Sequence, residues 1–183
     1  MKIIKYKIEM LSDWHVGSGL DSGADADSVV LKDDNNLPYI PGKTIKGLLK
    51  DSLLDISELE HQDIGSKIDN LFGNVNSDNS TMSGKLFFSN AELSEAEQTD
   101  INSNNLSSKL YKNIASTSID EKGIAKRSSL RTMEVCIPVT LYGMIEGDEI
   151  DSDLFDMTFK WTRQLGVNRN RGLGRCKFSI LKD

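Results

Sequence analysis

The residues best suited to chemistry lie near the C-terminus, in the run LGVNRNRGLGRCKF from Leu165 to Phe178. Glycines let a backbone turn with positive φ and approach a ligand closely, and the amides of such a turn form an anion-binding concavity. Arginine adds bidentate contacts to phosphate. The run has neither the strand-to-helix order of a dinucleotide fingerprint nor the ending of a P-loop. We interpret it as a phosphate-binding loop, with a solvated basic turn as the alternative. Its candidate residues are Arg169, Arg171, Gly172, Gly174 and Arg175.

A second basic cluster opens a predicted helix in the run LPYIPGKTIKGLLK, which spans residues 37–50. Lys43, Lys46 and Lys50 fall in its first turns, where the helix dipole disfavours positive charge unless an anion lies nearby. The unsatisfied amides of a helix N-terminus attract an anion as well. We therefore expect these lysines and the C-terminal loop to bind one polyanion. The alternative is a helix that tolerates lysines on its surface.

An acidic segment supplies the candidates for a cation site. Residues 13–34 hold six acids against one lysine. Asp21, Asp25 and Asp27 lie in its middle, among small residues typical of a loop. Carboxylate oxygens are the protein ligands that Mg²⁺ prefers. On residue type alone, however, each of these acids is more typical of a solvated loop.

The charge of the chain is segregated. With 183 residues, a net charge of −6 and a pI of about 5.0, the chain is a poor candidate for nucleic-acid binding by its whole surface. Residues 163–177 nevertheless hold five basic residues and no acid, and residues 122–131, which include Arg127 and Arg131, hold four more. This pattern is what a groove for a polyanion beside an acidic loop would produce.

Composition also bounds the class of protein. We find no apolar run long enough to cross a bilayer and no signal peptide after Met1, so we expect a cytoplasmic protein without a membrane partner. Cys136 and Cys176 are expected to be small core residues, since the spacings typical of a metal site, such as CxxC, are absent.

Hydrophobic periodicity predicts the elements that position these residues. Alternation predicts strands at residues 4–10, 85–90, 133–141 and 176–180. Helical spacing predicts helices at residues 43–54, 63–72 and 152–165, the second ended by Gly73 and the third by Gly166. In the third helix we expect the apolar stripe to consist of Leu154, Thr158, Trp161 and Leu165.

The long polar stretch from residue 92 to about residue 123 holds little that could fill a core, so we expect it to leave the domain as an excursion. Without it, the order of the elements is βαββαβ. That order predicts an α+β protein with a ferredoxin-like, RRM-like fold, in which two helices back one antiparallel sheet. Such a fold hosts many functions, so the function must come from the sites.

Six motifs carry a resemblance to a known family. They are HVGSG at 15–19, LPYIPGKTIKGLLK at 37–50, LFG at 71–73, GKLFFSNAEL at 84–93, LRTMEVC at 130–136 and NRNRGLGR at 168–175. Together they resemble the RAMP superfamily of CRISPR-associated proteins. The closest similarity is to the crRNA-binding backbone subunit of type III effector complexes of the Csm or Cmr type, and it covers nearly the whole chain.

The resemblance implies one RAMP domain over residues 1–183, with an inserted thumb at about 92–131. Such a subunit would bind crRNA and complementary target RNA, and copies of it would form a filament with other type III subunits, including the large polymerase-like subunit and a small helical subunit. The loop that contains His15 would contact the RNA backbone. The RNA-binding candidates are His15, Gly17, Lys43, Lys46, Lys50, Arg127, Arg131, Arg169, Arg171, Gly172, Gly174 and Arg175.

The resemblance also implies a nuclease that cuts target RNA. The family's catalytic aspartate lies in a loop before the extended segment that leads to the PG turn, and Asp27 is the best match to that position. Asp27 would bind Mg²⁺ or another divalent cation beside the scissile phosphate. Asp21 and Asp25 are neighbours that could assist.

Two alternatives remain at this point. One is a catalytically inactive structural or capping RAMP subunit that only binds guide RNA. The other is an endoribonuclease that processes guide precursors, with His15 as its general acid or base. His61, the second histidine, lies in a polar stretch typical of a surface.

Overall fold

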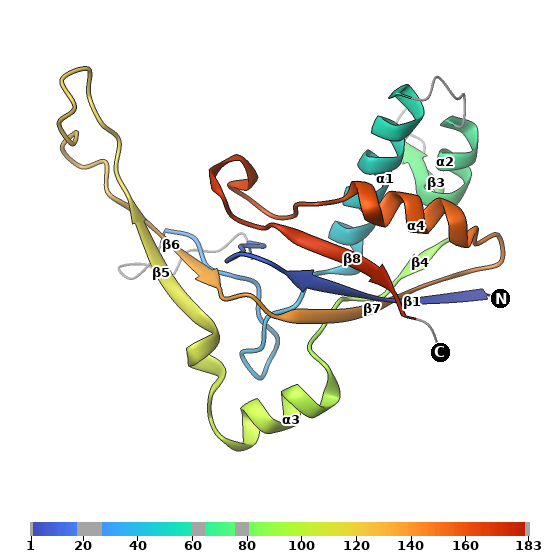
Figure 1. The fold of residues 1–183 in the computed structure, drawn as a ribbon, viewed down its shortest axis with the longest axis horizontal. Coiled ribbons are helices and arrows are strands. Elements are labelled where there is room, and N and C mark those ends of the chain that lie inside the picture. Colours follow the sequence, from blue (N-terminus) through green and yellow to red (C-terminus); the bar gives the residue numbers. More distant parts are fainter. Residues whose placement is uncertain (1, 18–26, 60–64, 76–80, 182–183) are drawn as a thin grey trace.

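The computed structural model describes residues 2–17, 27–59, 65–75 and 81–181 (Figure 1). Its strands are β1 (Lys2–Met10), β2 (Gly73–Val75), β3 (Thr81–Ser83), β4 (Phe87–Phe88), β5 (Tyr111–Ser116), β6 (Arg131–Cys136), β7 (Thr140–Gly147) and β8 (Cys176–Ile180). Its helices are α1 (Gly42–Leu59), α2 (Gly65–Phe72), α3 (Glu95–Ser103) and α4 (Ser152–Trp161), with short 3-10 turns η1 (Ser107–Leu110) and η2 (Arg169–Arg171). Among these described residues, no helix is long and apolar enough to cross a membrane.

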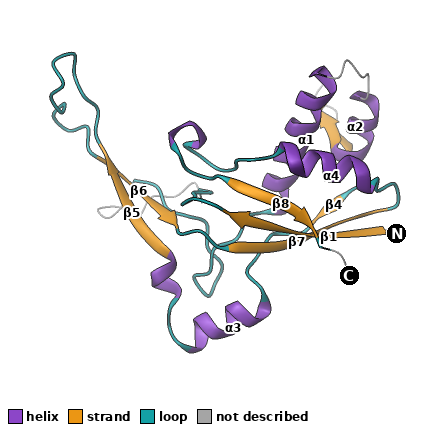
Figure 2. Cartoon of the chain, in the orientation of Figure 1, coloured by secondary structure: helices purple, strands orange, loops and turns teal. Residues whose placement is uncertain are grey.

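The main sheet has the strand order β4-β7-β1-β8 and is antiparallel throughout. With α1 between β1 and β4, and α4 between β7 and β8, this is the ferredoxin-like βαββαβ arrangement (Figure 2). The predicted fold class is therefore confirmed.

The core lies between this sheet and its helices. Along β1 the side chains of Ile4, Tyr6, Ile8 and Met10 are buried, because alternate residues of a strand face the same side. The helices α1 and α4 cover that side with residues at helical spacing. The buried apolar residues they contribute are Ile45, Leu49, Leu53, Ile56, Phe155 and Phe159.

The prediction of one strand over residues 133–141 was wrong. Residues up to Cys136 belong to β6, which pairs with β5, whereas Thr140 begins β7, which pairs with β1. Pro138 lies in the break, where it supplies no backbone N–H and disfavours the helical region for the residue before it. The apolar alternation continues through the break, but the two halves serve different sheets.

The prediction for α4 was wrong at its C-terminal end. The helix ends at Trp161, which is 45% exposed, and the buried stripe is Phe155, Thr158 and Phe159. The chain then runs extended beside β8, where the amide of Cys176 donates to the carbonyl of Arg163 at 2.9 Å. This pairing along the sheet edge competes with further helix and ends it.

Other boundaries differ in extent. Helix α1 continues to Leu59, beyond the predicted end at residue 54, because Ile56 still packs in the core. The strand predicted at residues 85–90 shortens to two residues, Phe87–Phe88. Helix α2 ends before Gly73 as predicted, and the part of its predicted span before Gly65 lies outside the described residues.

The segment predicted to protrude does so in part. The strands β5 and β6 form a two-stranded hairpin that extends away from the main sheet (Figure 1). Most of this stretch is exposed, as expected, although Leu93 and Leu110 are buried and Ile101 and Tyr111 pack against the core. The base of the segment is thus anchored while its far end extends.

Candidate nucleic-acid interface

A cavity of about 500 Å³ lies where three segments distant in sequence meet: residues 27–28, the β5–β6 hairpin, and the loop around η2. It brings the carboxylate-bearing Asp27 together with two arginines, Arg131 and Arg171. Its lining residues are Asp27, Ser28, Ile114, Ser116, Arg131, Thr132, Met133, Asn168, Arg171 and Leu173. The two arginines can contact phosphate oxygens in the same space that Asp27 faces.

Asp27 is held by the β6 strand at two points. Its backbone N–H donates to the carbonyl of Thr132 at 2.8 Å, and its Oδ2 accepts the backbone N–H of Thr132 at 2.7 Å. The residue is otherwise exposed. Among the described residues, no hydrogen bond to Oδ1 is seen, so that oxygen can take part in chemistry. Asp21 and Asp25 lie outside the described residues.

The C-terminal loop has the backbone that its glycines predict. Asn168 and Gly172 flank η2 with φ of 54° and 88°, and Gly174 has φ of 70°. A Cβ on Gly174 would collide with the carbonyl oxygen of Leu165, so only glycine fits there. The turn leaves Arg169 and Arg171 exposed.

The start of α1 meets this loop. Lys43 and Arg169 line one hollow of about 310 Å³, so the predicted juxtaposition of the two basic segments holds for this pair. The helix can begin so close to β4 because Gly42 has no side chain: a Cβ there would collide with the carbonyl oxygen of Phe88. The amide of Gly42 donates to Oδ1 of Asn90 at 3.1 Å.

Two other lysines of α1 point elsewhere. Lys46 and Lys50 line a separate hollow of about 380 Å³ beside the β2–β3 hairpin. The Nζ of Lys50 forms an ion pair with Asp69 at 3.1 Å and donates to the carbonyl of Gly73 at 2.6 Å. Lys50 therefore stabilises the α1–α2 packing, and its charge is already compensated.

His15 is not a surface residue. It is 1% exposed, and its two ring nitrogens face the carbonyl of Glu134 at 2.7 Å and Oγ of Ser28 at 3.0 Å. Both ring nitrogens are therefore occupied by protein groups, and contact between RNA and the loop that contains His15 stays a prediction. The nearby Gly17 is exposed and forms an isolated bridge with Val30. His61 lies outside the described residues.

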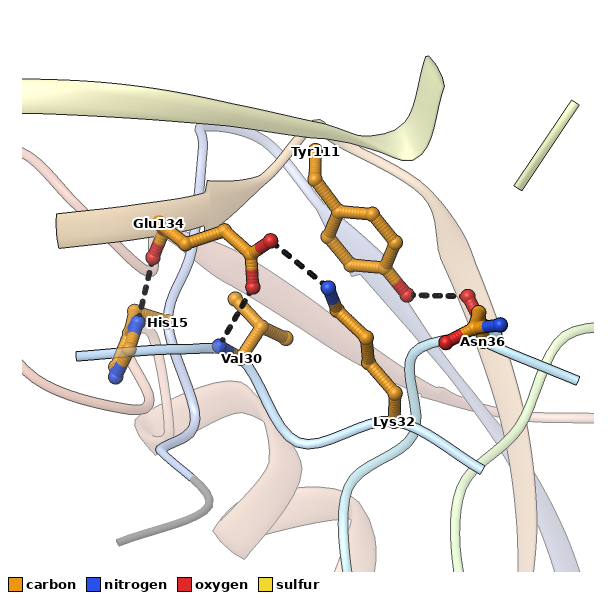
Figure 3. A network of polar contacts seen from close by, with 6 residues as sticks. All are labelled: His15, Val30, Lys32, Asn36, Tyr111 and Glu134. Atoms are coloured by element: carbon orange, nitrogen blue, oxygen red, sulfur yellow. Dashed lines mark hydrogen bonds and ion pairs between the residues drawn. The ribbon is translucent and has the colours of Figure 1, made fainter. Parts of the chain in front are cut away.

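Sequence reasoning missed Glu134, which joins the acidic segment to the hairpin (Figure 3). Its Oε2 accepts the amide of Val30 at 3.0 Å, and its Oε1 pairs with Lys32 at 2.8 Å. The Nζ of Lys32 also lies 3.9 Å from the ring centroid of Tyr111. The sequence did contain a signal for this charge pair, because Lys32 is the one lysine among the six acids of residues 13–34.

Tyr111 completes this network. Its hydroxyl donates to the carbonyl of Asn36 at 2.8 Å, and burial raises the pKa of the phenol, so the hydroxyl stays protonated. On the neighbouring β5 residue, Lys112 forms an ion pair with Asp13 at 2.8 Å. The hairpin is thus fixed at its base to the segments on both sides of the acidic loop.

The remaining arginines lie at different distances from the cavity. Arg131 starts β6 and lines the cavity, and Arg175 is exposed just before β8. Arg127 is exposed in the loop that joins β5 to β6. The cavity and the Lys43–Arg169 hollow therefore include four of the eight predicted basic residues. The other four are absent from the residues that line these two hollows: Lys46, Lys50, Arg127 and Arg175.

Comparison with known proteins fits this architecture. The model of the RAMP superfamily matches residues 7–177. The chain belongs to the RAMP superfamily. No curated protein matches the sequence significantly.

Two solved structures share this RAMP fold over nearly the full length of both chains. A chain of the type III-B Cmr-beta complex in its apo state has a TM-score of 0.72 at 14% identity, covering 99% of this chain and 98% of that one. A chain of the type III-B Cmr-beta complex bound to cognate target RNA has a TM-score of 0.75 at 12% identity, covering 98% and 97%.

The donor set of this RAMP protein limits how a metal could bind. Among the described residues, no three His, Cys, Asp or Glu side chains gather as a metal site. Asp27 offers one carboxylate, and one of its oxygens already accepts a hydrogen bond. Mg²⁺ is commonly held by one or two carboxylates, with water and substrate phosphate as its other ligands. Asp27 fits that mode and not an all-protein cage.

Proposed function

We propose that this chain is a crRNA-binding backbone subunit of a type III CRISPR complex and that it cleaves complementary target RNA, with Asp27 as its catalytic residue. The observation that carries the proposal is the cavity in which Asp27 lies with Arg131 and Arg171. Membership of the RAMP superfamily and the fold shared with type III-B Cmr-beta chains support the guide-binding part.

In this proposal the exposed basic residues hold RNA phosphates. Lys43 and Arg169 would bind the guide backbone, while Arg131 and Arg171 would contact the phosphate to be cut. Sequence selectivity would come from pairing between guide and target, by analogy with other guided systems. The acidic remainder of the surface would limit binding to this face.

Asp27 would act beside the scissile phosphate. Its carboxylate would orient the attacking 2′-hydroxyl by accepting its hydrogen bond, and the arginines would stabilise the charge that develops on the phosphate. Attack by the 2′-oxygen forms a bond to phosphorus as the bond to the 5′-oxygen breaks; the proton of the 2′-hydroxyl passes to solvent, and the departing 5′-oxygen takes up a proton from solvent. The products would therefore carry a 2′,3′-cyclic phosphate and a 5′-hydroxyl. A Mg²⁺ held by Asp27 would supply Lewis acidity at that phosphate.

The proposed partners follow from the same model. They are crRNA, target RNA, further copies of this chain, the large polymerase-like subunit and a small helical subunit. One of the similar structures is described as bound to cognate target RNA, which supports the RNA partners.

The test uses the chain assembled with guide RNA and its partner subunits, an end-labelled complementary RNA and Mg²⁺. Wild type is compared with Asp27→Ala and with Asp34→Ala, a control in an exposed acid of the same segment. We expect a regular ladder of cuts that disappears in Asp27→Ala, persists in Asp34→Ala and is lost on chelation. Retained target binding by Asp27→Ala would show that only cleavage is affected.

A second candidate is a structural or capping RAMP subunit that binds guide RNA without cutting. It is favoured by the donor set, because Asp27 is the one carboxylate among the described residues that line the cavity, which is sparse for metal-dependent cleavage. Tight target binding by wild type with no ladder would support it. Processing of guide precursors by His15 is disfavoured, because His15 is 1% exposed and contacts protein groups at both nitrogens.

A further inference from the structure

The segment that carries Asp27 pairs with β6 as a short added strand. Ser28 forms a parallel bridge with Met133, and the amide of Glu134 donates to the carbonyl of Ser28 at 3.0 Å. Together with the two bonds between Asp27 and Thr132, these contacts place the segment on the hairpin. The position of Asp27 is therefore set by β6, outside the main sheet.

Glu134 closes this pairing with its side chain. Its side chain is 15% exposed, and its carboxylate accepts from two donors, the Val30 amide at 3.0 Å and the Lys32 ammonium at 2.8 Å (Figure 3). Together with the hydrogen bond that the backbone N–H of Glu134 donates to the carbonyl of Ser28, these contacts hold the segment on both sides of residue 29. A carboxylate with little exposure is costly unless such donors satisfy it, so each donor is restrained in turn.

The backbone carbonyl of Glu134 also contacts His15. Its carbonyl can only accept, so Nδ1 of His15, 2.7 Å away, carries the ring proton. In the neutral ring, Nε2 is then the acceptor, and the hydroxyl of Ser28 donates to it at 3.0 Å. His15 thereby fixes the side chain of the residue next to Asp27.

We propose that Glu134 is a positioning residue for cleavage, which holds the segment bearing Asp27 at the correct place in the cavity; this rests on the proposed function of Asp27. Glu134 is absent from the residues that line the cavity, so it acts through the segment and not on the RNA. Residues that position a reacting group are worth much in rate, since a shift of about 1 Å can cost about 100-fold.

The substitution Glu134→Gln tests this with little change of shape. A carboxylate can accept from two donors at once, whereas an amide has only one oxygen and must turn its NH₂ group toward Val30 N–H or Lys32. We expect cleavage to slow roughly 10- to 100-fold while affinity for target RNA stays unchanged. Glu149→Gln is the matched control, since Glu149 pairs with Lys85 on an exposed surface.

A second variant keeps the test sound if Glu134→Gln is poorly folded. In Lys32→Met/Glu134→Gln the second donor is gone, so the amide oxygen can accept the Val30 N–H without a clash. We expect this double variant to cleave faster than Glu134→Gln alone. If Glu134→Gln acted only by destabilising the fold, the loss of cleavage caused by Lys32→Met would instead add to the loss caused by Glu134→Gln.

The experiment uses the assembled complex and measures single-turnover cleavage, target affinity and amide hydrogen exchange at residues 27–32. Slower cleavage in Glu134→Gln, with faster exchange and unchanged target affinity, would support the proposal. Cleavage and exchange like wild type, or a parallel loss of target binding, would overturn it. A wild type that does not cut, or cutting that survives in Asp27→Ala, would instead refute the proposed function, and is thus distinguishable.

Discussion

In the proposed function, the salt dependence of RNA binding would separate the basic residues that the structure exposes from those whose charge is already paired within the protein. Arg171 is exposed at the cavity, and no hydrogen bond or ion pair to its guanidinium is seen among the described residues. Lys50, in contrast, is bound to Asp69 and to the carbonyl of Gly73. We therefore expect Arg171→Ala, but not Lys50→Ala, to remove a phosphate contact.

The magnitude follows from counterion release. For single-stranded RNA, each lost phosphate contact makes the plot of log affinity against log salt shallower by about 0.7. Between roughly 50 and 200 mM salt, the affinity ratio of wild type to Arg171→Ala should therefore shrink by about 2.6-fold. Lys50→Ala should keep the wild-type slope and lower the free energy of unfolding by about 1 kcal/mol, because it loses a hydrogen bond and an ion pair.

Fluorescence anisotropy with a labelled single-stranded target RNA, over a salt series, measures these slopes for the full chain. Thermal unfolding of the same samples gives the stability difference and shows that each variant is folded. Equal slopes for wild type and Arg171→Ala would refute the assignment of the η2 loop as a phosphate-binding loop. A slope for Lys50→Ala as shallow as that of Arg171→Ala would refute the inference that Lys50 is occupied by its bonds to Asp69 and Gly73.

Two further predictions concern the scaffold. Asp151 caps α4 by accepting the amide of Leu154, which holds the pKa of its carboxyl below the usual 3.8; the stability it adds is therefore present above that pH and lost as pH falls below it. At pH 7, Asp151→Ala should lower the free energy of unfolding, measured with urea, by about 1 kcal/mol, and Asp151→Asn should lower it much less. If the difference between wild type and Asp151→Ala persisted in acid, the capping role would be contradicted. Burial raises the pKa of the Cys136 and Cys176 thiols to about 12, so iodoacetamide should leave both unlabelled at pH 8 until denaturant is added. Labelling of either thiol in the native protein, followed by mass spectrometry, would contradict that burial.

Features that depend on local chemistry could be predicted from the sequence. Alternating apolar residues predicted β1, helical spacing predicted most of α1, and the glycines around Arg171 predicted a turn with positive φ. Each depends on steric or periodic preferences of a few neighbouring residues, so the sequence contains what is needed. The order of these elements then predicted the ferredoxin-like class.

Tertiary structure alone decided which residues meet. Alternation from Met133 to Leu141 says that side chains alternate in direction, but not which strand pairs with which half, so the division at Pro138 was missed. The burial of His15 depends on the elements that cover it, and no neighbouring residue signals that. The cavity joins Asp27, Arg131 and Arg171 across more than half of the chain, because only the packing of the hairpin and the η2 loop brings those segments together.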